Sequence, residues 1–182
     1  VRVIEQSGPG AVRFEFGRPS AAVIQRLKAG GSVLLATETS VAEALTIARS
    51  GMDFIVAQGI EAGGHRGHFD PQAFDHQMST FTLVQAIRQH TAHPLIAAGG
   101  IMDGSGIAAM LQLGATGLPF GTAFVLFPDS ASNAPYPAAM TPASATGPEP
   151  PAAISCRPAR CLRTEFSDFS RAFAACAVPS YQ

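Results

Sequence analysis

Phe54-Ile-Val-Ala-Gln-Gly-Ile-Glu-Ala-Gly-Gly-His-Arg-Gly-His68 is the stretch that decides the predicted fold. It opens with the apolar run Phe54–Ala57, which is typical of a strand buried on both faces. A loop rich in glycine follows, and glycine lets a backbone adopt positive φ and approach a ligand closely. This loop carries His65 between glycines. A buried strand that delivers a histidine on such a loop is how an α/β enzyme presents a catalytic group.

Length and composition bound the class of protein. The 182 residues are enough for one sizeable core. The chain is 47% hydrophobic with a mean hydropathy of +0.20, yet it has no apolar span of the ~18 residues that a transmembrane helix needs. A net charge of −1 gives no indication that the chain binds nucleic acid or acidic lipid. Three cysteines without metal spacing, and no signal peptide, predict reduced thiols in a cytoplasmic protein.

Strand and helix patterns alternate along the first two thirds of the chain. Strands are predicted at 12–16, 32–36, 54–57, 94–98 and 118–125, and helices at 20–28, 40–50, 79–90 and 103–113. This alternation is typical of the βα repeat of a parallel sheet. The composition then changes to Pro, Ala, Ser and Thr. We therefore predict a βα domain over 1–127, a flexible segment over 128–153 and a tail over 154–182.

Two further glycine clusters follow predicted strands, at Gly99-Gly100 and Gly121-Thr122. In βα barrels, late loops often hold a phosphate on backbone N–H groups and a helix N-terminus. The helix that opens at Asp103 supplies such a terminus, and Thr122 adds a hydroxyl. The alternative is that these glycines only permit tight turns. Together with Gly63-Gly64 in the first loop, the clusters favour phosphate binding.

His65 is the candidate catalytic residue, because an imidazole titrates near neutral pH and suits proton transfer. The alternative is a structural histidine. Glu61 is interpreted either as a hydrogen-bond acceptor for the loop backbone or as a residue that orients His65. No metal site is predicted, because His65 and His68 lack a third ligand. The other histidines are interpreted as surface or loop residues: His68, His76, His90 and His93.

These motifs resemble those of a known enzyme family, the nitronate monooxygenases, formerly called 2-nitropropane dioxygenases. The first block is Ala57-Gln-Gly-Ile-Glu-Ala-Gly-Gly-His-Arg-Gly67, which resembles the family signature. A second block comprises Pro94-Leu-Ile-Ala-Ala-Gly-Gly-Ile-Met-Asp-Gly104, 108–117 and Phe120-Gly-Thr122, and Arg157-Pro-Ala-Arg160 resembles the family's C-terminal segment. The match covers most of residues 11–127.

The resemblance implies an FMN-dependent TIM (β/α)8 barrel that oxidises alkyl nitronates with O₂ to a carbonyl compound and nitrite. It implies that His65 takes a proton from the carbon bearing the nitro group. The partners would be the small nitronate and O₂, with FMN bound without a covalent link. The implied cofactor-binding residues are Thr37, Gln58, Gly63, Gly64, Gly99, Gly100, Gly121 and Thr122.

A flavin-dependent enoyl-acyl carrier protein reductase is the second hypothesis, because it shares the barrel and a similar Glu-Ala-Gly-Gly-His stretch. It would use NAD(P)H to reduce a fatty-acyl double bond. The lead-in Ala57-Gln58-Gly59 and the exit His65-Arg66-Gly67 look more like the monooxygenases.

The barrel is expected to be incomplete. A complete one needs eight strands and typically ~250 residues, whereas five βα units are predicted here, with the N-terminal units missing. Pro119 and Ala123 also depart from the family pattern. A fragment or truncated gene product that binds ligand without catalysis is therefore the third hypothesis.

Overall fold

The computed structural model describes residues 1–131, 140, 157–163 and 165–170. They belong to two compact units, and each is described by itself. The first unit comprises Val1–Glu61 and Gly67–Pro119, and the second comprises Ala62–Arg66 and Phe120–Gln182. Most of the segment 128–153 lies outside the described residues. The predicted division into 1–127, 128–153 and 154–182 stays a prediction.

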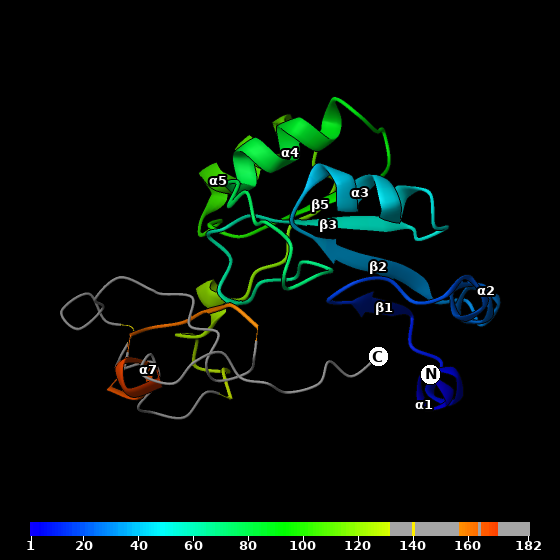
Figure 1. The fold of residues 1–182 in the computed structure, drawn as a ribbon, viewed down its shortest axis with the longest axis horizontal. Helices are drawn as coiled ribbons and strands as arrows, with labels where there is room; N and C mark the ends of the chain where they lie inside the picture. Colours follow the sequence, from blue (N-terminus) through cyan, green and yellow to red (C-terminus); the bar gives the residue numbers. More distant parts are fainter. Residues whose placement is uncertain (132–139, 141–156, 164, 171–182) are drawn as a thin grey trace. The chain divides into compact units, whose positions relative to one another are not determined.

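A parallel sheet of four strands forms the first unit (Figure 1). Its order is β1-β2-β3-β5, with β1 at Ala11–Phe14, β2 at Val33–Glu38, β3 at Phe54–Gln58 and β5 at Leu95–Ala98. Since the strands are parallel, their C-terminal ends lie along one side, which we call the carboxyl edge. The α/β class and the parallel βα order predicted from the sequence are confirmed.

Helices connect the strands, and α3 and α4 both contact β3 (Figure 1). The helix that follows β2 begins after Ser40, whose hydroxyl accepts a hydrogen bond from the Glu43 N–H as predicted. The Glu43 carboxylate reaches back to the N–H of Thr39 instead of to that of Ser40. The helices of this unit are α1 (Arg2–Ser7), α2 (Ala21–Ala29), α3 (Val41–Ala48), α4 (Thr80–Arg88) and α5 (Gly104–Gln112).

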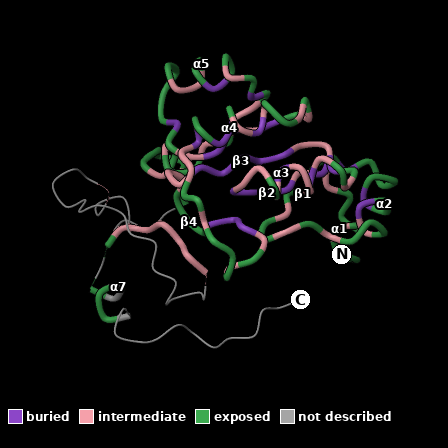
Figure 2. Tube along the Cα trace, turned by 45° about the horizontal axis from the view of Figure 1, so that its top comes forward, coloured by how far each residue is buried: buried purple, intermediate pink, exposed green. Residues whose placement is uncertain are grey.

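The core lies along the two central strands, where most residues of β2 and β3 are buried (Figure 2). Ile55 and Ala57 are fully buried, and Val56 between them is nearly so. Because successive side chains of a strand point to opposite faces, burial of these three residues means that both faces of β3 are covered, which explains the continuous apolar run in its sequence. Helix side chains such as Ile47 and Leu83 complete the packing.

The predicted strand at 118–125 is wrong. Only Gly117 pairs with the sheet, through a parallel bridge to Ile96. Pro119 follows, and a proline has no N–H to donate to a strand ladder. Thr122–Phe124 then form a 3₁₀ helix, η1. The described sheet therefore has four strands and one bridge where five strands were expected, and the incomplete (β/α)8 barrel stays a prediction.

The second unit holds a small antiparallel pair. β4 (Gly64–His65) pairs with β6 (Ala159–Arg160), so that His65 lies opposite Ala159. The N–H of Arg66 extends the ladder by donating to the carbonyl of Pro158 over 2.8 Å. A helix, α7 (Glu165–Ser170), lies at the start of the helical pattern predicted for 166–176, whose last six residues lie outside the described ones.

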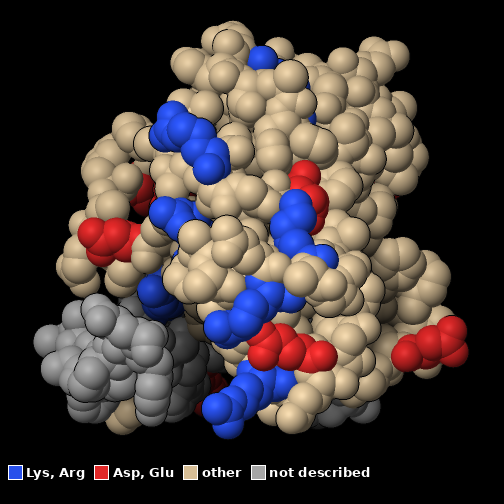
Figure 3. Space-filling model, turned by 90° about the vertical axis from the view of Figure 1, so that its right-hand side faces the viewer, with Lys and Arg blue, Asp and Glu red and all other residues tan. Residues whose placement is uncertain are grey.

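Charges of both signs lie interspersed among uncharged residues on the face shown in Figure 3. In the first unit, Arg26 pairs with Glu5 and Lys28 with Asp53, each over 2.7 Å. Among the residues that the structure describes, no helix combines the length and the hydropathy that crossing a membrane requires.

Candidate active site

Two of the predicted cofactor residues lie at the carboxyl edge of the first unit. Thr37 is the penultimate residue of β2, and Gln58 is the last residue of β3. Both polar side chains are buried, with 0% and 6% of their surface exposed. Polar groups buried at the end of parallel strands are uncommon in a core and common at α/β ligand sites. The strand-end positions predicted for Thr37 and Gln58 are thus confirmed, and their contact with a flavin stays a prediction.

Gln58 fixes the end of the glycine-rich loop by a hydrogen bond. Its Oε1 accepts a hydrogen bond of 2.8 Å from the N–H of Gly67, and this bond is buried. Gly67 itself packs tightly, because a β-carbon there would lie 2.6 Å from Cγ2 of Thr37 and 3.1 Å from Oε2 of Glu15. A contact of 2.6 Å is shorter than real β-carbons make, so only glycine fits. The ends of β1, β2 and β3 therefore fix this part of the loop together.

His68 was interpreted as a surface or loop residue, and the structure shows a loop residue that is buried, with 5% of its surface exposed. Its two neighbours explain the burial. The Gly67 N–H is held by Gln58, and the Phe69 N–H donates to Oε1 of Glu43 over 2.7 Å. Backbone held on both sides draws the side chain between them inward. The signal was present in the sequence, because Gln58 and Glu43 both stand where a strand or helix meets the carboxyl edge.

Glu61 supports the start of α4. Its Oε2 accepts from the N–H of Thr80 over 2.9 Å and from the Thr80 hydroxyl over 3.1 Å. Thr80 is the first residue of the helix, where backbone N–H groups lack partners within the helix. These hydrogen bonds go to the start of a helix, so the two interpretations of Glu61, as an acceptor for the loop backbone or as a residue that orients His65, stay predictions. Glu61 also lies against Gly100, where a β-carbon would be 3.0 Å from its own.

Gly99 and Gly100 both have positive φ, 116° and 68°, directly after β5. This conformation explains why the sequence has glycine at both positions and leaves their backbone open to a ligand. The helix that follows is already capped, because the Asp103 carboxylate accepts from the Ser105 hydroxyl and from the Gly106 N–H. These hydrogen bonds lower the pKa of Asp103. An ionised Asp103 repels a second anion, so a phosphate fits the Gly99-Gly100 backbone better than the helix end.

In the second unit, the structure brings two of the predicted residues together. A β-carbon on Gly63 would lie 3.0 Å from Oγ1 of Thr122, so the loop backbone approaches that hydroxyl closely. Gly64 has φ 82°, which favours glycine. His65 is exposed, and its backbone is fixed by the pairing of β4 with β6. The role of His65 in proton transfer stays a prediction.

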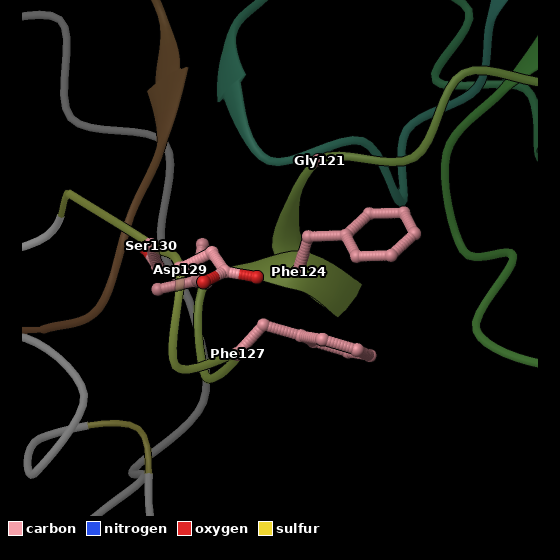
Figure 4. A pocket seen from close by; sticks show the side chains of 6 residues that line it. Gly121, Phe124, Phe127, Asp129 and Ser130 are labelled. Carbon is pink, nitrogen blue, oxygen red and sulfur yellow. The ribbon is translucent and has the colours of Figure 1, made fainter.

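Gly121 borders an open pocket of about 450 Å³ that the sequence analysis missed (Figure 4). The rings of Phe124 and Phe127, whose centroids are 5.0 Å apart, form its apolar part, and Asp129 and Ser130 lie beside them. An apolar wall with a carboxylate does not fit a phosphate. The spacing of Phe120, Phe124 and Phe127 in the sequence was the available signal for this aromatic group.

The residues present therefore fit a flavin phosphate in two places, each considered within its own unit. In the first unit, Gly99 is half-buried and Gly100 is exposed, and both have the positive φ that glycine allows. In the second, Gly63 leaves the Thr122 hydroxyl accessible. Among the described residues, no three side chains of His, Cys, Asp or Glu are grouped so as to hold a metal ion.

Comparisons with known proteins identify the family. The family model described as nitronate monooxygenase matches residues 1–180. A nitronate monooxygenase of Paraburkholderia phytofirmans is 47% identical over 165 residues, which are 91% of this chain and 45% of that protein. A nitronate monooxygenase of Pseudomonas aeruginosa is 47% identical over 132 residues, which are 72% of this chain and 38% of that protein.

Solved structures agree with this result. A nitroalkane oxidase from Streptomyces ansochromogenes superposes with a TM-score of 0.83 at 34% identity, covering 91% of this chain and 48% of that one. FabK from Thermotoga maritima gives a TM-score of 0.76 at 32% identity, covering 92% of this chain and 51% of that one. The chain spans about half the length of the relatives it matches. From the family model and from these identities, the chain belongs to the nitronate monooxygenase family.

Proposed function

We propose that this chain supplies the proton-transfer histidine and part of the flavin site of an FMN-dependent nitronate monooxygenase. The reaction oxidises an alkyl nitronate with O₂ to a carbonyl compound and nitrite. The observation that carries this proposal is the strand–loop stretch 54–68, in which Gln58 holds Gly67 at the carboxyl edge, two residues after His65 in the sequence. Family membership and the names of the relatives support it.

The chain's own residues take distinct parts in this proposal. When the neutral nitroalkane binds, an imidazole nitrogen of His65 accepts the proton from the carbon that bears the nitro group, which yields the nitronate that is then oxidised. Gln58 fixes the backbone of Gly67 at the carboxyl edge through a buried hydrogen bond. FMN, when bound, supplies the redox chemistry. The residues proposed to hold it are Thr37, Gln58, Gly99 and Gly100 in the first unit, and Gly63, Gly64, Gly121 and Thr122 in the second.

The histidine is tested by His65→Ala, with nitrite release as the readout. A neutral nitroalkane must first lose its proton, whereas a preformed nitronate has already lost it. His65→Ala should therefore lower turnover of the nitroalkane by about 100-fold or more, and turnover of the nitronate by much less. His90→Ala is the matched control, because His90 is exposed and contacts only its own helix through the Ala86 carbonyl. Equal losses on both substrates would contradict the base role.

Flavin binding is tested separately from turnover. The purified chain is incubated with FMN and desalted, and its visible absorbance is recorded. Retained absorbance supports the proposed site and makes nitrite release the next assay. Complete loss from a folded sample would show that the residues of this chain do not suffice for binding. Flavin retained by both the parent and His65→Ala, without turnover by either, would favour the non-catalytic hypothesis.

The enoyl reductase is a second candidate, because the likeness to FabK covers 92% of the chain. It predicts consumption of NAD(P)H when an enoyl thioester is added, which a monooxygenase does not require. Nitrite release without NAD(P)H consumption would exclude it. A cytoplasmic location belongs to the same proposal and is tested by cell fractionation.

A further inference from the structure

Thr80 places a buried hydroxyl where three segments of the first unit meet. It is the first residue of α4, and 3% of its surface is exposed. Its Oγ1 lies 2.9 Å from the carbonyl oxygen of Gly99, 3.1 Å from Oε2 of Glu61 and 3.3 Å from the carbonyl oxygen of Ala98. A hydroxyl has one hydrogen, so it can donate fully to one of these three acceptors.

The carbonyl of Gly99 is the acceptor that needs this hydrogen. The carbonyl of Ala98 already accepts from the N–H of Gly59 over 2.9 Å, and Oε2 of Glu61 already accepts from the N–H of Thr80. Within the described part of the chain, no other donor reaches the carbonyl of Gly99, and its distance to the hydroxyl is the shortest of the three. The hydroxyl of Thr80 therefore donates to Gly99, because a carbonyl without another partner gains the most from the bond.

The carbonyl of Gly99 fixes the direction of the N–H that follows it. Both groups belong to one peptide plane, and no peptide bond of the described residues is cis. In a trans peptide the C=O and the N–H point in opposite directions. A Gly99 carbonyl held against the buried hydroxyl therefore directs the N–H of Gly100 away from Thr80, and Gly100 is exposed. No described residue accepts a hydrogen bond from this N–H.

Close packing holds Thr80 in place. A β-carbon on Gly59 would overlap the N and Oγ1 of Thr80, so the chain that leaves β3 lies directly against the start of α4. A β-carbon on Gly100 would lie 3.0 Å from that of Glu61, so the turn after β5 is packed closely as well. The carboxylate of Glu61 bonds to the first N–H of α4, where the positive end of the helix dipole offsets its charge. A hydroxyl packed in this way sets the position of the carbonyl to which it donates.

We propose that Thr80 is a positioning residue for phosphate binding: its hydroxyl holds the carbonyl of Gly99 and thereby aims the N–H of Gly100 at a phosphate monoester. This inference rests on the proposed function, in which the Gly99-Gly100 backbone binds the FMN phosphate, and it adds a residue that acts through the backbone. A phosphate oxygen accepts strong hydrogen bonds from N–H groups that point at it. Thr80 therefore affects binding of the phosphate and leaves binding of the flavin ring unchanged.

The test compares Thr80→Val, which keeps the shape of threonine without the hydroxyl, and Thr80→Ser, which keeps the hydroxyl. Quenching of flavin fluorescence gives the dissociation constants of FMN and of riboflavin, which lacks the phosphate. Thr80→Val should weaken FMN binding about tenfold and riboflavin binding by less than about twofold. Thr80→Ser should keep FMN binding within about threefold of the parent. If Thr80→Val does not fold, Thr80→Cys replaces it, because a thiol is a weak donor of similar size.

Thr116→Val is the matched control. The hydroxyl of Thr116 also donates to a carbonyl of β5, that of Leu95 over 3.1 Å, at the opposite end of the strand. This variant should keep both dissociation constants within about twofold of the parent. Thermal unfolding shows whether each variant is folded. Equal losses of FMN and riboflavin binding in Thr80→Val would indicate a structural role alone and overturn the inference, as would unchanged binding of FMN.

Inorganic phosphate is a second probe, and it separates this inference from the proposed function. In the parent, titration with phosphate should shift the amide resonance of Gly100 in NMR spectra. Thr80→Val should remove most of this shift, and Thr116→Val should keep it. A parent that shows this pattern but releases no nitrite would refute the proposed reaction and leave the inference standing.

The opposite result is equally distinct. A parent that releases nitrite, with the preference for FMN over riboflavin unchanged in Thr80→Val, would overturn the inference alone. A parent that neither prefers FMN to riboflavin nor shifts the Gly100 resonance with phosphate would overturn it as well.

Discussion

The close contact between Thr37 and Gly67 can be tested by two substitutions, one that adds a methyl group at Gly67 and one that removes a methyl group from Thr37. In Gly67→Ala, the new methyl would lie 2.6 Å from Cγ2 of Thr37, which is fully buried and cannot withdraw into solvent. In Thr37→Ser, that Cγ2 is removed, while the hydroxyl that accepts from Nε of Arg13 remains. The double variant contains the same atoms as the parent at this contact, with the methyl on the other residue.

The magnitudes follow from the contact. Gly67→Ala overpacks a rigid site and should lower the free energy of unfolding by about 2 kcal/mol. Thr37→Ser removes one buried methyl and should cost about 1 kcal/mol. If the two effects were independent, the double variant would lose about 3 kcal/mol of unfolding free energy. Because the new methyl fills the space that Cγ2 has left, we expect the double variant to lose only about 1 kcal/mol. The coupling between the two positions is then about 2 kcal/mol, at the upper end of neighbouring pairs.

Urea denaturation followed by circular dichroism measures all four proteins of this cycle. Gly104→Ala is the control, because a β-carbon there meets nothing within 4 Å and the residue opens α5. It should leave stability unchanged or raise it by up to about 1 kcal/mol. A Gly67→Ala variant as stable as this control, or a double variant that loses the sum of the single losses, would refute the reasoning.

Two further predictions concern the ends of the sheet. Glu61→Ala removes both hydrogen bonds to Thr80 and should lower the free energy of unfolding, measured by urea denaturation, by about 2 kcal/mol. Glu61→Gln should recover more than half of this loss. Equal losses in the two variants would contradict the capping role. Burial raises the pKa of Asp53, but hydrogen bonds from Lys28 and the Leu34 N–H outweigh it and hold that pKa below 3.8. The ionised carboxylate therefore stabilises the fold above pH 3.8, and the contribution is lost as the pH falls further. Asp53→Asn should remove this acid-dependent loss of the urea midpoint, and an unchanged pH profile would contradict it.

The elements of the first unit were predictable because their signals are local. The apolar run at 54–57 indicates a buried strand, and Ser40 with Glu43 indicates a helix start; both were found where expected. The predicted strand at 118–125 failed because the pattern of apolar residues was given more weight than Pro119. A strand also needs a neighbour to pair with, and periodicity alone does not provide one.

The strand-end positions of two candidate site residues were predictable from the sequence, whereas the contacts around them were not. Thr37 and Gln58 were placed correctly at strand ends, because parallel strands bring those ends together. The residues on either side of His68, Gly67 and Phe69, donate backbone hydrogen bonds to Gln58 and Glu43, which are distant in the sequence. The burial of His68 depends on these bonds. The left-handed φ of 63° at Phe16 is a backbone property that no side-chain pattern encodes.

The pairing of β4 with β6 has a consequence for the order in which the molecule assembles. Its two partners, His65 and Ala159, are so distant in the chain that closing the loop between them carries a large entropic cost for a ladder of two residues. The parallel strands around Gln58, by contrast, join segments much nearer in sequence and bury an apolar core. The sheet is therefore expected to form first and to open last. The pairing that holds the backbone of His65 is therefore expected to open at a lower free energy than the pairing within the sheet.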